Sequence, residues 1–260
     1  MDTVTLDMVR AAKERLNGVA QHTAIMQSTA VSTCSHCNVF LKMENLQRTG
    51  SFKLRGAYNK VASLSEAEKA RGIVASSAGN HAQGVALAAS EYGVKATICM
   101  PSNAPLSKID ATRSYGADVV LAGDFYSDAY DKACELEKEK GLTFCHPFND
   151  PLVIAGQGTI ALEILEDVPE TDVIVVPIGG GGLISGIAVA AKAIKPSVRI
   201  VGVQTASMPS MKVSVEDDKL TTLPSHKSLA DGITVGTPGD VTFELVKKYV
   251  DDIVTVDESE

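Results

Sequence analysis

Lys53 is the residue of this chain whose type and position best suit covalent chemistry. It lies in residues 49–57 (TGSFKLRGA), where apolar residues begin to recur at the spacing of a helix. The positive end of the helix dipole and burial would both lower the pKa of an amine placed there. The neutral amine that results is the form that Schiff-base chemistry needs. On these residues alone, a solvated surface lysine is the more common alternative.

A second segment, residues 76–84 (SSAGNHAQG), lies between a predicted strand and a predicted helix. Its small residues let a ligand approach the backbone, and the free N–H groups of a helix start can bind a carboxylate. Asn80 can donate to an oxygen, and His81 can add charge or a hydrogen bond. The alternative is an ordinary turn from strand to helix in which Asn80 is the cap.

Four consecutive glycines, residues 179–182, follow the most strand-like run of the chain. Their N–H groups would form a nest suited to a phosphate. The segment is neither a Walker loop nor a dinucleotide-binding motif with an acidic partner. Because four glycines are costly in conformational entropy, an anion site is favoured over a purely structural turn. A fourth segment, residues 155–159 (AGQGT), could line the same cleft or simply pack against a neighbouring helix.

The elements that must position these segments alternate between strand and helix, which predicts an α/β fold with parallel sheets. Ligands of such sheets bind at the carboxyl ends of the strands. Residues 207–240 have less periodicity and are interpreted as a loop-rich excursion over the sheet edge. Strands are predicted at residues 72–75, 94–100, 117–121, 143–148, 173–176 and 200–203, and helices at 54–61, 82–89, 106–115, 126–133 and 154–164.

Composition excludes several classes of protein. The chain has 260 residues with 24 basic and 32 acidic side chains, so its net charge is −8 and broad nucleic-acid binding is not expected. Hydrophobic residues make up 45%, which fits a globular protein with a proper core and excludes disorder. No basic and apolar leader is visible after Met1, and the five cysteines are an odd number, so a cytoplasmic location is expected.

Two features of the sequence could indicate a membrane span or a zinc site. Residues 173–191 carry no charge and could nearly span a bilayer, but Pro177 and the four glycines favour a strand, a turn and a short helix. A membrane protein is therefore not expected. Cys34, His36 and Cys37 have the spacing of half a zinc site, but the chain has no second such pair, so no metal is expected.

Residues 51–57, 77–84 and 179–183 together resemble the three signatures of the pyridoxal-phosphate enzymes of fold type II, the tryptophan-synthase-β type. Within that group, the chain is similar to the threonine ammonia-lyase (threonine dehydratase) and serine racemase family, and most of all to the short catabolic threonine dehydratases. The resemblance implies two domains of three-layer α/β/α build. Residues 1–54 and 151–260 would form the large cofactor-binding domain, and residues 55–150 the small, mobile substrate domain.

The resemblance also implies a role for individual residues. Lys53 would be the catalytic residue, which binds pyridoxal 5'-phosphate covalently and later removes the substrate's α-proton as general base. Asn80 would bond the phenolic oxygen of the cofactor. The phosphate would be held by the N–H groups of Gly179, Gly180, Gly181, Gly182 and Leu183. The substrate carboxylate would be bound by Ser77, Gly79 and His81.

The reaction implied is the conversion of L-threonine to 2-oxobutanoate and ammonia, with L-serine as a second substrate. A serine racemase, or a non-catalytic form that binds a nucleotide or a partner, is the alternative. Racemases of the family need a serine where this chain has Ala78. They also bind a divalent cation with acidic residues, where this chain has residues 204–210 (QTASMPS) without a carboxylate. Both departures favour the ammonia-lyase.

Weaker features of the resemblance concern regulation and assembly. Arg48, Thr49 and Gln83 resemble part of the nucleotide-effector site of the short dehydratases, although Arg48 suits a solvated loop equally well.

Family members continue past residue 257 and there supply a partner to the cofactor's pyridine nitrogen. We therefore expect a large domain that is truncated at its C-terminus, an exposed apolar sheet surface, and association into a homo-oligomer, a dimer or tetramer.

Overall fold

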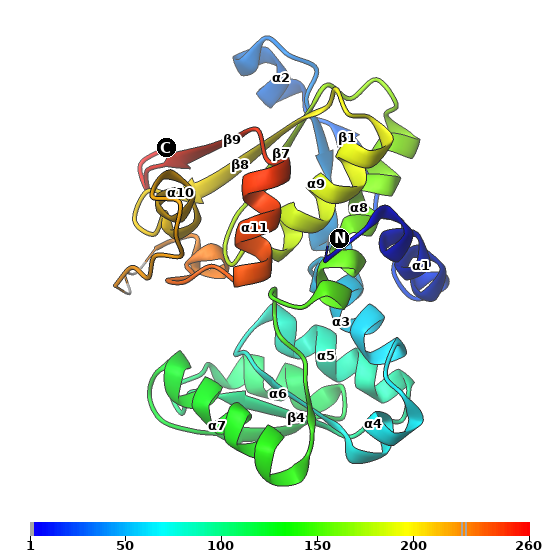
Figure 1. Cartoon of the computed structure of the whole chain (residues 1–260), viewed down its shortest axis with the longest axis vertical. Helices are drawn as coiled ribbons and strands as arrows, with labels where there is room; N and C mark the ends of the chain where they lie inside the picture. Colours follow the sequence, from blue (N-terminus) through cyan, green and yellow to red (C-terminus); the bar gives the residue numbers. More distant parts are fainter. Residues whose placement is uncertain (1–2, 225, 227) are drawn as a thin grey trace.

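Two parallel sheets form the framework of the molecule, one in the upper and one in the lower half of Figure 1. The computed structural model describes residues 3–224, 226 and 228–260. The upper sheet has the order β7-β8-β9, and its strands are β7 (Val173–Pro177), β8 (Arg199–Thr205) and β9 (Asp252–Val256). The lower sheet has the order β5-β4-β3-β6, and its strands are β3 (Ile73–Ser76), β4 (Ala96–Met100), β5 (Asp118–Leu121) and β6 (Thr143–Phe144).

Helices pack against each sheet, as expected when parallel strands are joined by crossover connections. Around the upper sheet lie α1 (Leu6–Leu16), α8 (Pro151–Asp167), α9 (Gly182–Ile194), α10 (Ser210–Glu216) and α11 (Asp240–Tyr249). Around the lower sheet lie α4 (Glu66–Arg71), α5 (Asn80–Glu91), α6 (Leu106–Ser114) and α7 (Tyr126–Lys140). Helix α3 (Lys53–Ala62) contacts α5 below and α8 above, so it joins the two halves.

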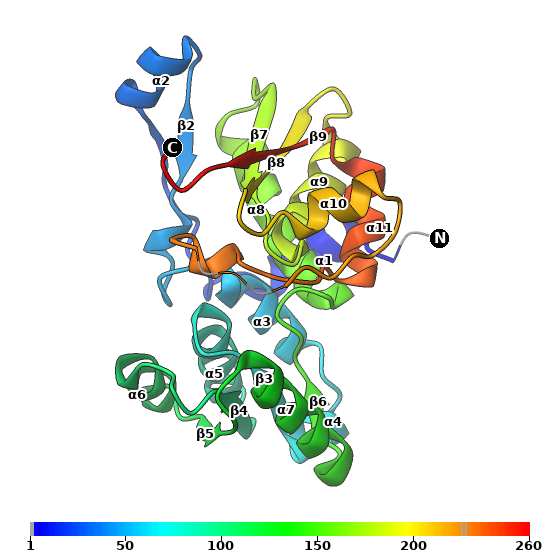
Figure 2. The ribbon, with the colours of Figure 1, turned by 90° about the vertical axis from the view of Figure 1, so that its left-hand side faces the viewer.

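A small unit projects from the upper half in both Figure 1 and Figure 2. It consists of an antiparallel pair of strands, β1 (Ile25–Gln27) and β2 (Phe40–Lys42), with α2 (Thr29–Ser35) between them. The short helical turns η1 (Glu44–Leu46) and η2 (Asp231–Ile233) complete the described elements. None of the residues of α2 is buried, so this unit adds little to the core.

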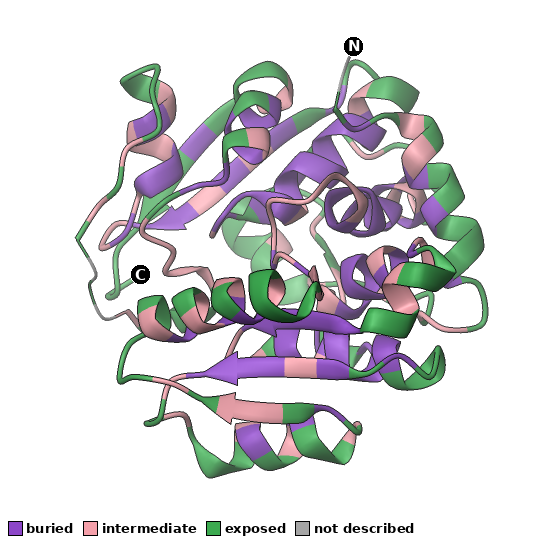
Figure 3. Cartoon of the chain, turned by 60° about the horizontal axis from the view of Figure 1, so that its bottom comes forward, coloured by how far each residue is buried: buried purple, intermediate pink, exposed green. Residues whose placement is uncertain are grey.

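The upper sheet has one buried cluster and the lower sheet has two, the smaller of which lies against α7, and buried residues gather in the middle of the molecule (Figure 3). Leu16 and Val153 belong to the larger of the two lower clusters although they lie outside residues 55–150. The core of the lower half therefore crosses the predicted boundaries. The division into residues 1–54 with 151–260 and residues 55–150 stays a prediction.

The close crossing of α3 and α8 explains the small residues of segment 155–159. A Cβ on Gly156 would lie 2.5 Å from the carbonyl oxygen of Arg55, so only glycine allows this approach. Asp150 begins α8 by accepting hydrogen bonds from the N–H groups of Leu152 and Val153, and Pro151 occupies the first turn. Segment 155–159 therefore serves helix packing, the second of its two interpretations.

Most predicted elements are present, and two differ. The strand predicted at residues 143–148 ends at Phe144. Cys145 still donates a hydrogen bond to Val74 of β3, and a turn closed by the side chain of His146 follows. A helix, α10, lies in the stretch that was interpreted as loop-rich. It has only seven residues, which is too short for a clear helical period.

The uncharged run at residues 173–191 forms β7, the glycine turn and most of α9, as predicted. In the described part of the chain, no helix is both long and apolar enough to cross a bilayer. One face of the upper sheet has the exposed apolar surface that was expected. Val175 of β7 is 63% exposed and Val254 of β9 is 41% exposed.

Candidate active site

Lys53 is the first residue of α3, and its amine points toward the chain that follows β6. The Nζ of Lys53 donates a hydrogen bond to the carbonyl oxygen of Pro147 at 2.7 Å. The side chain keeps some exposed surface, yet burial around the amine lowers its pKa from 10.5 to about 8, against a smaller opposing effect of Cys145. Lys53 therefore has the lowered pKa that covalent chemistry at an amine requires.

This lowered pKa predicts how the reactivity of Lys53 depends on pH. The pKa of Lys53 is about 8 in the folded protein and 10.5 in the unfolded chain. A reagent that attacks neutral amines should label Lys53 half-maximally near pH 8 in the folded protein and near 10.5 in urea, as read by mass spectrometry of its peptide. Half-maximal labelling at the urea value in the folded protein would contradict the burial of this amine.

The same shift affects stability. Between pH 8 and 10.5 the unfolded chain binds one more proton at Lys53 than the folded chain does. The contribution of Lys53 to the free energy of unfolding therefore rises with pH across this window, and the penalty for burying the ammonium is fully present below pH 8.

The segment after β3 forms a loop that borders open space. The Oγ of Ser77 accepts a hydrogen bond from the N–H of Gly79 at 3.2 Å. A Cβ placed on Gly79 would meet no atom within 4 Å, so a ligand has room to approach this backbone. Asn80 is exposed and is the first residue of α5, whose N-cap is Gly79. The interpretation of Asn80 as the helix cap is therefore wrong.

His81 is buried, with 2% of its surface exposed, and its Nε2 lies 2.9 Å from the carbonyl oxygen of Cys145. Burial, followed by the charge of Lys53, lowers the pKa of His81 to about 3. The ring is therefore neutral at pH 7, and Nε2 must carry the hydrogen that Cys145 accepts. Of the two expected contributions of His81, charge or a hydrogen bond, the lowered pKa excludes charge at neutral pH, and the ring makes a hydrogen bond.

The neutral ring restricts how His81 can bind a carboxylate. Its Nδ1 is then a lone-pair acceptor, buried and without a partner among the described residues. A lone pair repels a carboxylate oxygen. The backbone N–H of His81, at the start of α5, is the group that can donate. The role of His81 in binding a carboxylate therefore stays a prediction, and it now concerns the backbone N–H instead of the ring.

The four glycines form the turn between β7 and α9. Gly181 has φ +95°, a left-handed conformation that favours glycine. The carbonyl oxygen of Gly180 accepts hydrogen bonds from the Oγ1 of Thr242 at 2.6 Å and from the N–H of Gly239 at 3.4 Å. Since the C=O and N–H of a trans peptide point in opposite directions, the N–H of Gly181 faces away from α11.

The N–H groups of this turn are available to a ligand. Among the hydrogen bonds between described residues, none is donated by an N–H of residues 179–183. These groups lie at the N-terminus of α9, where the helix dipole also favours an anion. We name the backbone of residues 179–183 the glycine cradle.

Residues 145–148 bring the three segments together. The carbonyl of Cys145 accepts from His81, and the carbonyl of Pro147 accepts from Lys53. The ring of Phe148 lies against the glycine cradle, because a Cβ on Gly180 would be 2.4 Å from it. Sequence reasoning missed this segment as part of the site. Pro147 could have indicated that the chain leaves the predicted strand here, because proline is rare inside a strand.

Arg48, Thr49 and Gln83, the residues predicted for a nucleotide effector, each have different surroundings. Arg48 lies 2.6 Å from the Oε1 of Glu91 and forms an ion pair with it. Thr49 is buried with an unpartnered hydroxyl, and Gln83 is half-buried on α5. Within the described chain, no hydrogen bond or ion pair links these three residues.

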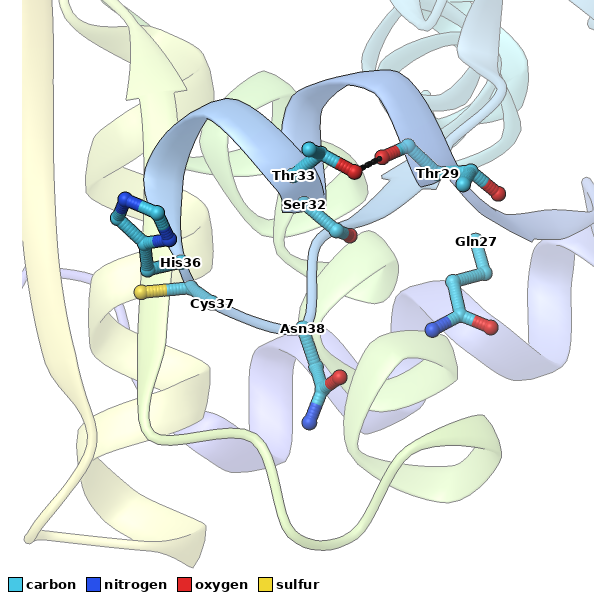
Figure 4. A pocket seen from close by; sticks show the side chains of 7 residues that line it. All are labelled: Gln27, Thr29, Ser32, Thr33, His36, Cys37 and Asn38. Carbon is cyan, nitrogen blue, oxygen red and sulfur yellow. Dashed lines mark hydrogen bonds between the residues drawn. The ribbon is translucent and has the colours of Figure 1, made fainter.

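A pocket of about 370 Å³ lies in the projecting unit, between the end of β1, helix α2 and the segment 36–38 that follows α2 (Figure 4). Its lining is polar and consists of Gln27, Thr29, Ser32, Thr33, His36, Cys37 and Asn38. For the part of the chain that the structure describes, no three His, Cys, Asp or Glu side chains are grouped to hold a metal ion.

A carboxylate reaches the stretch 204–210 from elsewhere in the chain. Glu258 accepts hydrogen bonds from the Oγ of Ser228 at 2.6 Å and the N–H of Leu229 at 2.9 Å, and lies 3.4 Å from the Oγ of Ser207. The sequence of residues 204–210 gave no sign of this contact, because Glu258 is distant along the chain.

Lys53 and the glycine cradle suit one kind of ligand. The amine can form a covalent bond with an aldehyde, and the cradle can bind a phosphate. Both lie against residues 147–148, as described above. The arrangement therefore fits a phosphorylated aldehyde.

Comparison with known proteins supports this interpretation. The sequence model of a family described as pyridoxal-phosphate dependent enzyme matches residues 17–260. The chain is 55% identical to an L-threonine ammonia-lyase of Thermotoga maritima, over 99% of this chain and 64% of that protein. It is 49% identical to a catabolic L-threonine dehydratase of Escherichia coli, over 99% of this chain and 78% of that protein. The chain thus spans just under two thirds of the Thermotoga protein.

Solved structures of similar fold include a maize serine racemase, with TM-score 0.96 and 39% identity over 99% of this chain and 78% of that one. They also include the processed form of threonine deaminase isoform 2 from Solanum lycopersicum. Its TM-score is 0.94 at 39% identity, over 97% of this chain and 69% of that one. These likenesses confirm the expected fold class.

Proposed function

Because the chain belongs to the family of pyridoxal-phosphate-dependent enzymes and has their fold type II, we propose that it is an L-threonine and L-serine ammonia-lyase. The proposed reaction converts L-threonine to 2-oxobutanoate and ammonia. The observation that carries the proposal is the convergence of the Lys53 amine and the unbonded cradle N–H groups on residues 147–148.

The residues present fit pyridoxal 5'-phosphate. Lys53 supplies an amine of lowered pKa for its aldehyde, and the glycine cradle supplies N–H donors for its phosphate. Asn80, exposed at the start of α5, is proposed to bond its phenolic oxygen. When bound, the cofactor stores the electrons that remain after a substrate loses its α-proton.

The groups of this chain would then bind the substrate and move its proton. With a pKa of about 8, the Lys53 amine is suited to accept the α-proton near neutral pH. The Ser77 hydroxyl and the N–H groups of Gly79 and His81 are proposed to hold the carboxylate. Movement of residues 55–150 as a small domain would exclude water from the proton that is transferred.

A change in the cradle predicts a loss of cofactor affinity. Gly181→Ala would strain a backbone at φ +95° and place a Cβ 2.8 Å from the Cβ of Thr242. We expect the affinity for pyridoxal 5'-phosphate to fall by at least about tenfold, as for the loss of a charge-assisted hydrogen bond. Binding is read as the visible absorbance of the covalent lysine–cofactor link.

Pyridoxal, which lacks the phosphate, is the matched control ligand. Its affinity should be much the same for the wild type and Gly181→Ala, because it does not use the cradle. An equal loss of affinity for both ligands would show that the glycine acts on the fold and not on the phosphate.

Serine racemase is the second candidate, because the maize enzyme of that name has a TM-score of 0.96 to this chain. A racemase must return a proton to the face of the substrate opposite to Lys53. The resemblance assigns that role to the position of Ala78, whose methyl group carries no exchangeable proton. The proposal therefore favours elimination over racemisation.

The test is an assay of the purified chain with added pyridoxal 5'-phosphate. L-Threonine should give 2-oxobutanoate and ammonia in equal amounts, and L-serine should give no D-serine on chiral chromatography. D-Serine as the main product would favour the racemase. Cofactor binding without turnover of either amino acid would leave the non-catalytic alternative.

The proposal also covers assembly. The exposed valines of the upper sheet support association into a dimer or tetramer, which sedimentation would measure.

The proposal further covers regulation and location. A nucleotide effector that binds Arg48 would compete with Glu91, so effector binding should weaken the ion pair between Arg48 and Glu91. The five cysteines are all free, which supports a cytoplasmic location.

A further inference from the structure

His146 closes a tight turn directly after β6. Its Nδ1 accepts hydrogen bonds from the N–H of Phe148 at 3.3 Å and from the N–H of Asn149 at 2.8 Å. Backbone N–H groups can only donate, so Nδ1 carries no hydrogen and the neutral ring has its hydrogen on Nε2. Both the acceptor atom and the tautomer are therefore set by the turn itself.

The turn that His146 closes contains the two groups that meet the proposed site. Pro147 lies between His146 and its two donors, and its carbonyl accepts the hydrogen bond of Lys53 Nζ at 2.7 Å. The ring of Phe148 lies against Gly180, and a Cβ on Gly182 would be 2.9 Å from the Cα, the Cβ and the carbonyl oxygen of Phe148. One imidazole thus shapes a backbone that contacts both the amine and the glycine cradle.

The surroundings of His146 keep it in the accepting form. Its ring packs edge-on against Phe148, with ring centroids 4.7 Å apart, and near Tyr130 at 6.3 Å. Burial lowers its pKa to about 4, with smaller effects of Asp150, Lys53 and Asp240. The acceptor is therefore present at the pH where the proposed reaction runs.

On the basis of the proposed function, we propose that His146 is a positioning residue for Lys53 and for the glycine cradle. By accepting hydrogen bonds from the N–H groups of Phe148 and Asn149, its Nδ1 holds the carbonyl of Pro147 near the amine and Phe148 against Gly180 and Gly182. It acts through these two neighbours rather than by touching the amine.

Two substitutions separate the acceptor from the ring. His146→Asn places an amide oxygen where Nδ1 stands and removes the ring. His146→Phe keeps an aromatic ring against Phe148 and removes the acceptor. If the acceptor matters, the asparagine variant should behave like the wild type and the phenylalanine variant should not.

The first readout is the rate at which an amine reagent labels Lys53 in the cofactor-free protein at one pH. His146→Phe should raise this rate by about tenfold, since two backbone donors lose their acceptor and the turn loosens. His146→Asn should restore the wild-type rate. Lys42 is the internal control, because its side chain is 8% exposed and its Nζ lies 2.6 Å from Glu163. Its labelling should not change.

The second readout is the affinity for pyridoxal 5'-phosphate, which should fall in His146→Phe and recover in His146→Asn. Wild-type labelling of Lys53 in His146→Phe, no recovery in His146→Asn, or equally faster labelling of Lys42 would each overturn the proposal. A wild-type chain that binds no cofactor would count against the proposed function alone, because the labelling of Lys53 still tests His146.

Discussion

Lys53→Ala is expected to abolish the turnover of L-threonine, with a loss of at least roughly 10³-fold to 10⁴-fold in kcat. The substitution removes the amine that would accept the α-proton and the group to which the cofactor would be attached. The visible absorbance of the covalent link should disappear as well. Both effects depend on one atom, the Nζ of Lys53. Its burial lowers the pKa of the amine to about 8.

The fold should survive this change. Removing an ammonium that is unfavourably buried below pH 8 takes away a penalty, so the midpoint of urea unfolding at neutral pH should stay equal or rise. Lys95→Ala is the matched control, because Lys95 is 78% exposed and pairs with Asp118 on the surface. Equal losses of activity in the two variants would contradict the assigned role of Lys53.

Arg55→Leu is expected to lower the free energy of unfolding by about 3–5 kcal/mol, the usual cost of removing one partner of a buried ion pair. Arg55 is 1% exposed and lies two residues after Lys53 on α3. Its Nη1 lies 2.6 Å from Glu163 of α8, and its Nε lies 2.8 Å from Glu44 of η1. Without the guanidinium, the carboxylates of Glu44 and Glu163 stay in place and lose the cation that they share, which destabilises the folded state.

Two further variants show whether the geometry of Arg55 matters. Arg55→Lys should recover only part of the stability, because an ammonium cannot make the paired hydrogen bonds of a guanidinium to two carboxylates. Arg10→Leu is the control. Its pair with Asp7 is 3.6 Å long and exposed, so the change should stay below about 1 kcal/mol. Urea unfolding measures all three, and a loss for Arg55→Leu as small as that for Arg10→Leu would contradict the network.

The parts of the site that could be predicted from the sequence are those with a local physical signature. A lysine at a helix start and four successive glycines each have unusual properties in their own few residues, and the structure places both against residues 147–148. The alternation of strands and helices likewise follows from periodicities that span fewer than a dozen residues. Such features need no knowledge of distant contacts.

The features that were missed depend on contacts between distant residues. The role of residues 145–148 arises only when Pro147 meets Lys53 and Phe148 meets Gly180. The neutral ring of His81 follows from its burial against Cys145, which the helix start alone did not reveal. Arg48 lies in a turn, and its ion pair with Glu91 at the end of α5 could not be seen in its own sequence neighbourhood. Its role in binding an effector stays a prediction.

The most direct test is to find which residue captures the cofactor. The chain is mixed with pyridoxal 5'-phosphate, treated with borohydride to make the link permanent, digested, and examined by mass spectrometry. We predict that the added mass lies on the peptide with Lys53, and that Gly181→Ala lowers the yield of this peptide. Modification of another lysine, or of none, would contradict the claim that this amine and the glycine cradle form one site.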